Sequence, residues 1–239
     1  MAPVALKKLI DASQLVGEGV YGSVFRYQDR LIKLDKILYH LLKEHDVNES
    51  EKIIYYRYTG GRENFNNPLQ IEQLCHLQKN VKLTKLPTGI VTLCNVDYQN
   101  IGLCAGILIP YLNGYTMLEN LPKNDLKRVL IILKKLLLEV RELEENGIYQ
   151  EDMFHFDGKG GTCYNIMYSN DTPAIIDMSG DYVVIGGNEH DRSAMYDELG
   201  QVIIDFLDYN GVISPYRRWY TNDYEKNCEL VKAFERSIK

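Results

Sequence analysis

The sequence has no apolar run long enough to span a membrane, and its first residues lack the apolar core and the small-residue cleavage site of a secretory signal. It also has no repeat of fixed period and no low-complexity linker that would divide independent domains. We therefore expect a cytoplasmic globular protein with no membrane span, built either as one large domain or as two closely connected lobes.

Paired cysteines and an excess of positive charge are also absent. An odd number of scattered thiols is typical of a reducing compartment. The net charge is −6 at pH 7, so no basic field covers the whole chain, which argues against a nucleic-acid partner. The five cysteines form no C-x-x-C pair and are Cys75, Cys94, Cys104, Cys163 and Cys228.

The sequence does contain a group of polar residues around a predicted hairpin. Of its 239 residues 45% are apolar, which is enough to bury a sizeable core. Apolar runs at residues 164–168 and 174–176 bracket turn residues at 169–173, which predicts two antiparallel strands. This hairpin would place Asn165 and Asp177 on one side, where two oxygen ligands suit Mg²⁺. A third acid, Asp152 or Asp157, lies just upstream.

A second group of residues lies near the start of the chain. Residues 15–34 form two alternating segments around a turn, which indicates a strand, a turn and a second strand. In a dinucleotide site the glycines lead into a helix, whereas here they lead into a strand that ends at Lys33. Backbone amides of a glycine turn can approach phosphates, and the Lys33 ammonium can neutralise their charge. The glycine segment comprises Gly17, Glu18, Gly19, Val20, Gly22 and Val24.

The order of these groups resembles that of the protein-kinase-like superfamily. A glycine turn, a strand lysine, an acid, Asn165-Ile166-Met167 and Ile175-Ile176-Asp177 follow one another as in that family, over residues 15–207. The resemblance implies ATP and Mg²⁺ as cofactors. It assigns the phosphates to the glycine segment and Lys33, magnesium to Asn165 and Asp177, and orientation of the acceptor hydroxyl to Asp152 or Asp157.

The catalytic-loop aspartate stays open between these two acids. In the family pattern H-R-D-x-x-x-x-N, the aspartate lies closer to the asparagine than either acid lies to Asn165 here. Either assignment therefore requires an insertion in the loop between the acid and Asn165. Asp152 follows a short predicted strand, as in the family, which favours it slightly. Asp157 follows His155-Phe156 and precedes Lys159, at a position where many protein kinases carry a phosphate-facing lysine.

A kinase-like protein also needs a helix glutamate that pairs with the strand lysine. Glu72 lies in a helix predicted at residues 69–80, and a predicted strand at 89–95 follows it in the family's order. Glu49 and Glu51 are rivals at a more usual distance from Lys33. The sequence leaves the choice among the three open.

The predicted fold is α+β and two-lobed. An apolar run at residues 104–110 indicates a buried strand followed by a turn. By resemblance this is the hinge, with Ile109 at the gatekeeper position and the backbone around Tyr111 and Leu112 against the adenine. The N-lobe is expected to be small and β-rich, and the C-lobe reduced and mainly helical. The lobes would span residues 1–110, with an inserted helical segment at about 35–68, and residues 111–239.

The C-lobe is predicted to lack a full activation segment. A long amphipathic helix is expected at residues 126–145, capped by Asn124 or Asp125, and a buried helix at 196–207. Between Asp177 and the second helix there is no A-P-E triplet and little room. This truncation resembles small effector kinases that viruses and bacterial pathogens place in the host cytosol.

The resemblance implies a Ser/Thr protein kinase that transfers the γ-phosphoryl group of ATP to a protein hydroxyl. The substrate would be a host protein in the case of an effector, with an activating protein partner as a further option. Two other functions fit the same residues. One is a kinase of small-molecule substrates, and the other is a pseudokinase that serves as a binding or scaffold protein.

Overall fold

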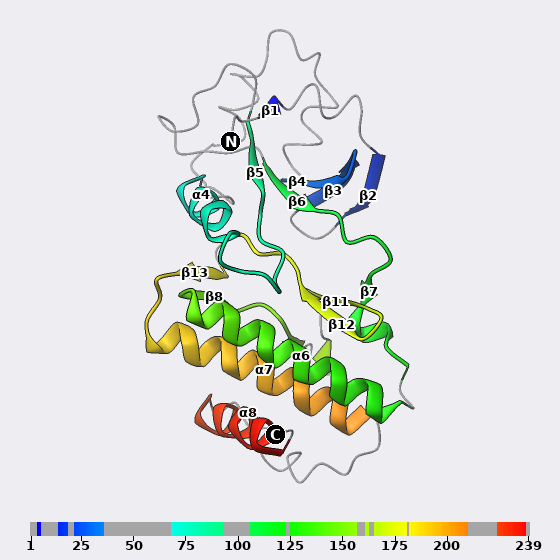
Figure 1. Cartoon of the computed structure of the whole chain (residues 1–239), viewed down its shortest axis with the longest axis vertical. Helices are drawn as coiled ribbons and strands as arrows, with labels where there is room; N and C mark the ends of the chain where they lie inside the picture. Colours follow the sequence, from blue (N-terminus) through cyan, green and yellow to red (C-terminus); the bar gives the residue numbers. More distant parts are fainter. Residues whose placement is uncertain are drawn as a thin grey trace. The chain divides into compact units, whose positions relative to one another are not determined.

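The computed structural model describes residues 4–5, 14–18, 22–35, 68–92, 106–122, 125–156, 161–162, 165–180, 182–209 and 224–237. The fold is mixed α+β, as the sequence predicted (Figure 1). The chain divides into two compact units. The first consists of Met1–Lys79, Leu86–Leu112 and Ser179–Asp181, and the second of Asn80–Lys85, Asn113–Met178 and Tyr182–Lys239.

The first unit is built on a six-stranded sheet in the order β1-β5-β6-β4-β3-β2. All neighbouring strands are antiparallel except the parallel pair β1 and β5. One helix, α4 (Pro68–Leu77), contacts β5 and buries Ile71 and Leu74. The strands are β1 (Val4–Ala5), β2 (Gln14–Glu18), β3 (Gly22–Tyr27), β4 (Arg30–Asp35), β5 (Gly89–Thr92) and β6 (Gly106–Pro110).

The hairpin of β3 and β4 confirms the predicted strand, turn and strand. Tyr27 pairs with Arg30, so Gln28 and Asp29 form the turn, and Gln28 adopts a positive φ of 56°. On its other edge β4 pairs with β6, where Gly106 stands opposite Leu34. A Cβ on Gly106 would lie 2.4 Å from the Lys33 carbonyl oxygen, so only glycine permits this approach of the two strands. The predicted insert at about 35–68 lies almost wholly outside the described residues.

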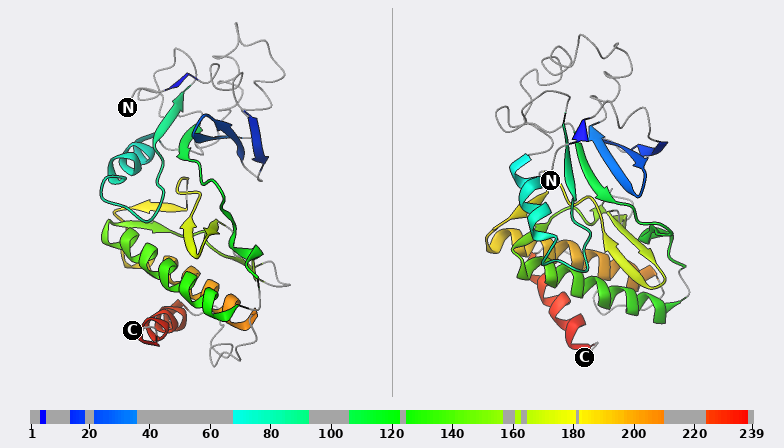
Figure 2. Two further views of the ribbon diagram at one scale, coloured as in Figure 1. Left: turned by 45° about the vertical axis from the view of Figure 1, so that its right-hand side comes forward. Right: turned by 45° about the horizontal axis from the view of Figure 1, so that its top comes forward.

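The second unit is organised around two long helices, α6 (Leu126–Glu145) and α7 (Glu189–Tyr209), which lie side by side in both views of Figure 2. A third helix, α8 (Tyr224–Ser237), packs on α7. Three small sheets have the orders β12-β11-β7, β13-β8 and β10-β9. The remaining elements are β7 (Thr116–Met117), η1 (Leu118–Asn120), β8 (Ile148–Gln150), β9 (His155–Phe156), β10 (Gly161–Thr162), β11 (Ile166–Ser169), β12 (Thr172–Ile175) and β13 (Val183–Ile185).

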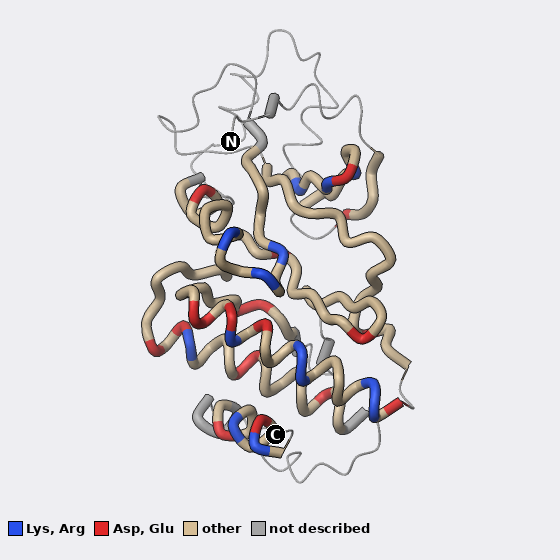
Figure 3. Tube along the Cα trace, viewed as in Figure 1, with Lys and Arg blue, Asp and Glu red and all other residues tan. Residues whose placement is uncertain are grey.

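Helix α6 forms where its apolar periodicity predicted it. The Asp125 side chain caps the first turn by accepting a hydrogen bond from Arg128 N at 3.1 Å. After Glu145 the chain leaves the helix through Asn146 and Gly147, and Gly147 adopts a φ of +67°. Four of the five basic residues of the helix lie in its first half, and all four acidic residues lie in its second half (Figure 3).

Helix α7 begins at Glu189, earlier than the predicted helix at 196–207. Its first turn is held by reciprocal bonds. The Asn188 side-chain oxygen accepts from His190 N at 2.7 Å, and Asp191 Oδ2 accepts from Asn188 N at 2.6 Å. This arrangement is a capping box with Asn and Asp as its residues. The prediction relied on the apolar residues at 196–207 and did not identify Asn188 and Asp191 as residues that begin the helix.

Polar contacts join helices α6, α7 and α8. The Glu144 carboxylate of α6 accepts from Arg192 Nε and from the Tyr196 hydroxyl of α7, each at 2.5 Å. Arg141 of α6 forms an ion pair with Glu235 of α8. Burial, reinforced by the bond to Glu144, raises the pKa of Tyr196 above its usual value. Within the described ranges, no helix has the length and apolar character needed to cross a bilayer.

Candidate functional site

The hairpin of β11 and β12 confirms the predicted strand pair. The strands pair antiparallel from Ile166 with Ile175 to Ser169 with Thr172. The turn itself is Asn170 and Asp171, both at positive φ (45° and 63°), which is the geometry of a tight two-residue hairpin. The predicted turn was longer because it included Pro173. In the structure Pro173 lies in β12, an edge strand, where a residue without an N–H is tolerated.

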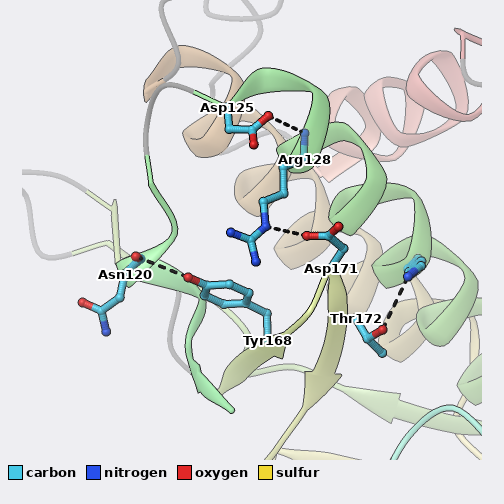
Figure 4. Close-up of polar contacts among 7 residues, drawn as sticks. Asn120, Asp125, Arg128, Tyr168, Asp171 and Thr172 are labelled. Atoms are coloured by element: carbon cyan, nitrogen blue, oxygen red, sulfur yellow. Dashed lines mark hydrogen bonds and ion pairs between the residues drawn. The ribbon is translucent and has the colours of Figure 1, made fainter. Parts of the chain in front are cut away.

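At the tip, the hairpin is tied to the first half of α6 (Figure 4). Arg128 Nε donates to Asp171 Oδ1 at 2.5 Å, and its guanidinium lies 5.5 Å from the centre of the Tyr168 ring. Lys135 Nζ donates to Thr172 Oγ1 at 3.4 Å. The turn is therefore held by two basic side chains of one helix.

The other end of the hairpin holds the two predicted magnesium ligands. Ile176 N donates to Asn165 O at 2.8 Å, which closes the strand pair beyond the last register position. Asn165 and Asp177 have positive φ angles of 63° and 59°. Such a backbone is uncommon for residues other than glycine, Asn and Asp tolerate it best, and it is frequent at functional sites. The structure thus brings these two residues to the same end of the hairpin in the same backbone conformation.

Asp152 joins them. Asn165 Nδ2 donates to the Asp152 carbonyl oxygen at 2.7 Å and to Asp152 Oδ2 at 3.0 Å. Asn165 is only 9% exposed, while Asp152 and Asp177 are partly exposed. The amide nitrogen of Asn165 is engaged in these two bonds, so Oδ1 is the atom of this side chain with metal-ligand character. Asp157, the rival aspartate, lies outside the described residues.

A buried glutamine joins two loops of the site. Gln150, 1% exposed, donates from Nε2 to the Asp177 carbonyl oxygen at 3.2 Å. Gln150 ends β8 two residues before Asp152. The bond therefore sets the distance between the loop that carries Asp152 and the loop that carries Asp177.

Glu198 of α7 holds the backbone that follows Asp152. Its Oε2 accepts from Met153 N at 3.1 Å and from Phe154 N at 2.5 Å. Burial raises the pKa of Glu198 to about 8, and the nearby carboxylates of Asp197 and Asp152 add to this, while the two N–H donors oppose it. The loop is thus fixed to a helix by a partly buried acid.

Glu139 of α6 holds the strand that leads to Asp177. Its Oε1 accepts from Ile175 N at 2.9 Å, and the residue is 2% exposed. Burial raises the pKa of Glu139 to about 7, against the opposing effect of the Ile175 N–H. The sequence contained a signal for this role, because an acid stands beside Val140 within the apolar stripe of the helix.

The predicted nucleotide-binding residues that the structure describes lie in the first unit. Lys33 of β4 pairs with Val24 of β3, and a Cβ on Gly22 would lie 3.1 Å from Lys33 Cε, so the glycine borders the lysine stem. Glu18 Oε1 accepts from the buried Ser23 hydroxyl at 3.3 Å. Gly17 lies in β2, and a Cβ there would meet no atom within 4 Å. Gly19 and Val20 lie outside the described residues.

The remaining predicted residues of this unit lie on β6, on the segment after it and on α4. Ile109 is in β6, and Tyr111 and Leu112 follow it. The Arg26 guanidinium lies 4.5 Å from the centre of the Tyr111 ring. Glu72 is partly exposed on α4. Its rivals Glu49 and Glu51 lie outside the described residues.

The side-chain oxygens of Asn165 and Asp177 restrict which metal ion could bind at this end of the hairpin. In the described part of the chain, no group of three or more His, Cys, Asp or Glu side chains is arranged to hold a metal ion. Asn165 and Asp177 provide one amide and one carboxylate oxygen. This pair fits Mg²⁺, which keeps several water ligands and takes others from substrate phosphates. It does not fit a structural zinc site.

A scan against protein-family models finds no match to this chain, and a search of curated proteins finds none either.

Proposed function

We propose that this chain is an ATP- and Mg²⁺-dependent phosphotransferase with a two-lobed protein-kinase-like fold, acting as a Ser/Thr protein kinase of minimal type. The observation that carries the proposal is the group of Asp152, Asn165 and Asp177 at one hairpin end, with two of the three in a left-handed backbone conformation. Metal-assisted phosphoryl transfer needs such a set of oxygen atoms, held before the substrate arrives.

In the proposed mechanism the acceptor hydroxyl oxygen attacks the γ-phosphorus of ATP. The bond from that phosphorus to the bridging oxygen breaks and ADP leaves. Asp152 orients the hydroxyl and receives its proton. Asn165 Oδ1 and the Asp177 carboxylate would hold Mg²⁺, which when bound neutralises the phosphate charge. The bond from Asn165 Nδ2 to Asp152 keeps the orienting acid beside the metal ligand.

The proposal assigns the nucleotide to the glycine segment and Lys33. The stem of Lys33 lies along Gly22, and an ammonium there can neutralise phosphate charge. Glu72 remains the proposed partner that directs Lys33, and the backbone around Ile109 to Leu112 the proposed contact of the adenine.

The short connection after Asp177 favours activity without loop phosphorylation. Only residues 186–188 separate β13 from α7, so no activation segment fits there. The loops of the site are held instead by Gln150, Glu198 and Glu139. A protein whose catalytic loops are already fixed does not need a phosphate to order them.

The decisive experiment compares two aspartates of the same hairpin. Asp177→Asn and Asp171→Asn make the same chemical change at two positive-φ positions, one at each end of the hairpin. The purified proteins are incubated with γ-labelled ATP, Mg²⁺ and a mixed protein extract. We expect label on proteins with wild type and Asp171→Asn, and a loss of at least a hundredfold with Asp177→Asn or with EDTA.

Other outcomes would replace the proposal. Label on small metabolites alone would indicate a small-molecule kinase. Thermal stabilisation by nucleotide without any transfer would indicate a pseudokinase. Equal labelling by wild type and Asp177→Asn would contradict the assignment of the site itself.

A further inference from the structure

One face of α6 carries apolar residues where solvent-facing positions are usually polar. Lys127, Ile131, Lys134 and Leu138 follow one another at helical spacing and share one face. Ile131 is 37% exposed and Leu138 48% exposed. We call these four residues the α6 stripe. Two large apolar side chains alternating with two lysines form a patch with the character of an interface.

A shallow depression lies beside the first half of the stripe. The described residues that line it all belong to α6 and are Leu126, Lys127, Leu130, Ile131 and Lys134. Leu126 is 38% exposed. The apolar residues that line the depression are therefore two leucines and one isoleucine, and the charged residues are two lysines. Such a site can accept one apolar side chain of a partner with acidic residues on either side of it.

The charge of this region is opposite to that of the chain. The net charge is −6, yet residues 126–135 contain four basic residues and no acid. The first turn of α6 also lacks an acid, although the positive end of the helix dipole lies there. Arg128 and Lys135 are bound to the hairpin tip. Lys127 and Lys134 line the depression, so an anionic segment of a partner would meet their positive charge there.

We propose that the α6 stripe and its depression form a docking surface for an acidic amphipathic segment of another protein. An apolar side chain of that segment enters the depression, and its acidic residues meet Lys127 and Lys134. The proposal does not depend on phosphotransferase activity. It concerns a surface whose described residues all belong to α6, apart from the hairpin end that holds Asp177.

Three other occupants fit less well. Recruitment to anionic lipid uses clusters of about four to eight basic residues, and only two of the described residues that line the depression are basic. Single-stranded nucleic acid binds through aromatic stacking as well as charge, and the stripe contains no aromatic residue. A second copy that paired stripe to stripe would bring four lysines into one interface with no acid from either stripe.

The test uses a displayed library of random 16-residue peptides, selected on the intact protein. Lys127→Glu/Lys134→Glu tests the charges, and Ile131→Ser tests the apolar floor. Lys82→Glu/Lys232→Glu is the matched control, because it makes the same charge change at exposed lysines elsewhere in the second unit. Circular dichroism and thermal unfolding verify that each variant is folded.

We expect the enriched peptides to combine apolar residues with Asp or Glu. Their affinity, measured by fluorescence anisotropy, should fall at least tenfold for Lys127→Glu/Lys134→Glu and for Ile131→Ser, and less than twofold for the control. Binding should also weaken as salt is raised. The reversed surface of Lys127→Glu/Lys134→Glu should select basic peptides in place of acidic ones.

The proposal is overturned if no peptide is enriched, or if the enriched peptides bind wild type and all variants equally. Binding to vesicles with 30% phosphatidylserine that disappears in Lys127→Glu/Lys134→Glu would assign the surface to a membrane instead. Concentration-dependent self-association that disappears in Ile131→Ser would assign it to a second copy of this chain.

Discussion

Asn165 and Asp177 serve backbone and side-chain roles at the same positions. Both have φ near +60°, which most side chains avoid, and both carry an oxygen suited to a hard cation. The turn geometry by itself favours Asn and Asp at these positions, so their identity alone is not evidence of metal binding. Substitutions that keep one property and remove the other can separate the two.

Asn165→Gly and Asn165→Ala provide this separation. Both remove the bonds to Asp152, whereas only alanine is strained at a φ of 63°. We expect Asn165→Gly to lower the free energy of unfolding by about 1–2 kcal/mol and Asn165→Ala by about 1 kcal/mol more. Urea unfolding measures both. If alanine were tolerated as well as glycine, backbone strain would not contribute to the choice of residue.

Glu139 should make stability depend on pH. Burial raises its pKa from 4.5 to about 7 in the folded protein. The folded state then holds a proton that the unfolded state releases. Stability is therefore highest below the unfolded pKa and is lost as pH rises toward 7. The loss is on the order of 3 kcal/mol for a shift of this size.

Glu139→Gln tests this dependence. The amide keeps an oxygen that accepts from Ile175 N and has no charge to bury. We expect the variant to match wild type near pH 5 and to be more stable by a few kcal/mol at pH 8, with Glu145→Gln on the exposed side of the same helix as the control. Urea unfolding from pH 5 to 8.5 gives both curves. Parallel curves for wild type and Glu139→Gln would refute the titration of Glu139 in this range.

At the scale of elements, α6 organises the hairpin at two points. Arg128 and Lys135 bind the tip, and Glu139 binds β12 near the site. Residues 128, 135 and 139 are spaced so that they share one face of the helix. This face differs from the face of the α6 stripe and from the apolar face that packs in the core. A single helix thus presents a core face, a hairpin face and the proposed docking face.

A double-mutant cycle measures the link between α6 and the hairpin tip. The pair of Arg128 and Asp171 is partly exposed, with side-chain exposures of 31% and 40%. We expect Arg128→Ala and Asp171→Asn to couple by about 0.5–1 kcal/mol in urea unfolding, because solvent screens such a pair. The cation–π contact with Tyr168 is lost only in Arg128→Ala and cancels in the cycle. A coupling near zero would mean that the tip is held by other contacts.

At the scale of the whole molecule, the proposed function predicts linkage between ligand and stability. If ATP and Mg²⁺ bind the folded protein, they stabilise it by about 2.7 kcal/mol at a hundredfold excess over Kd. We expect a rise in Tm with ATP and Mg²⁺ together, a smaller rise with ATP and EDTA, and little magnesium-dependent rise for Asp177→Asn. Differential scanning fluorimetry gives these values. A shift that did not depend on Mg²⁺ would argue against Asn165 and Asp177 as its ligands.

Periodicity in the sequence predicted most of the described elements. The β3 and β4 hairpin, α4, α6 and the β11 and β12 hairpin all formed close to the expected residues, because alternation and 3.6-residue spacing are local properties. Boundaries were less accurate where a polar signal competed with the apolar pattern. The capping box of Asn188 and Asp191 moved the start of α7, and Pro173 was counted in the turn although an edge strand accepts it.

Side-chain chemistry and chain order are local properties, so the candidate ligands and the order in which they occur could be identified without coordinates. Folding establishes the contact of Asp152 with Asn165. It also establishes the hydrogen bonds by which Gln150, Glu139 and Glu198 hold the neighbouring backbone. The physical reason is that these contacts join residues distant in the chain. The oxygens of Glu139 and Glu198 accept hydrogen bonds from backbone N–H groups that only folding brings to them, and no local sequence pattern encodes these contacts.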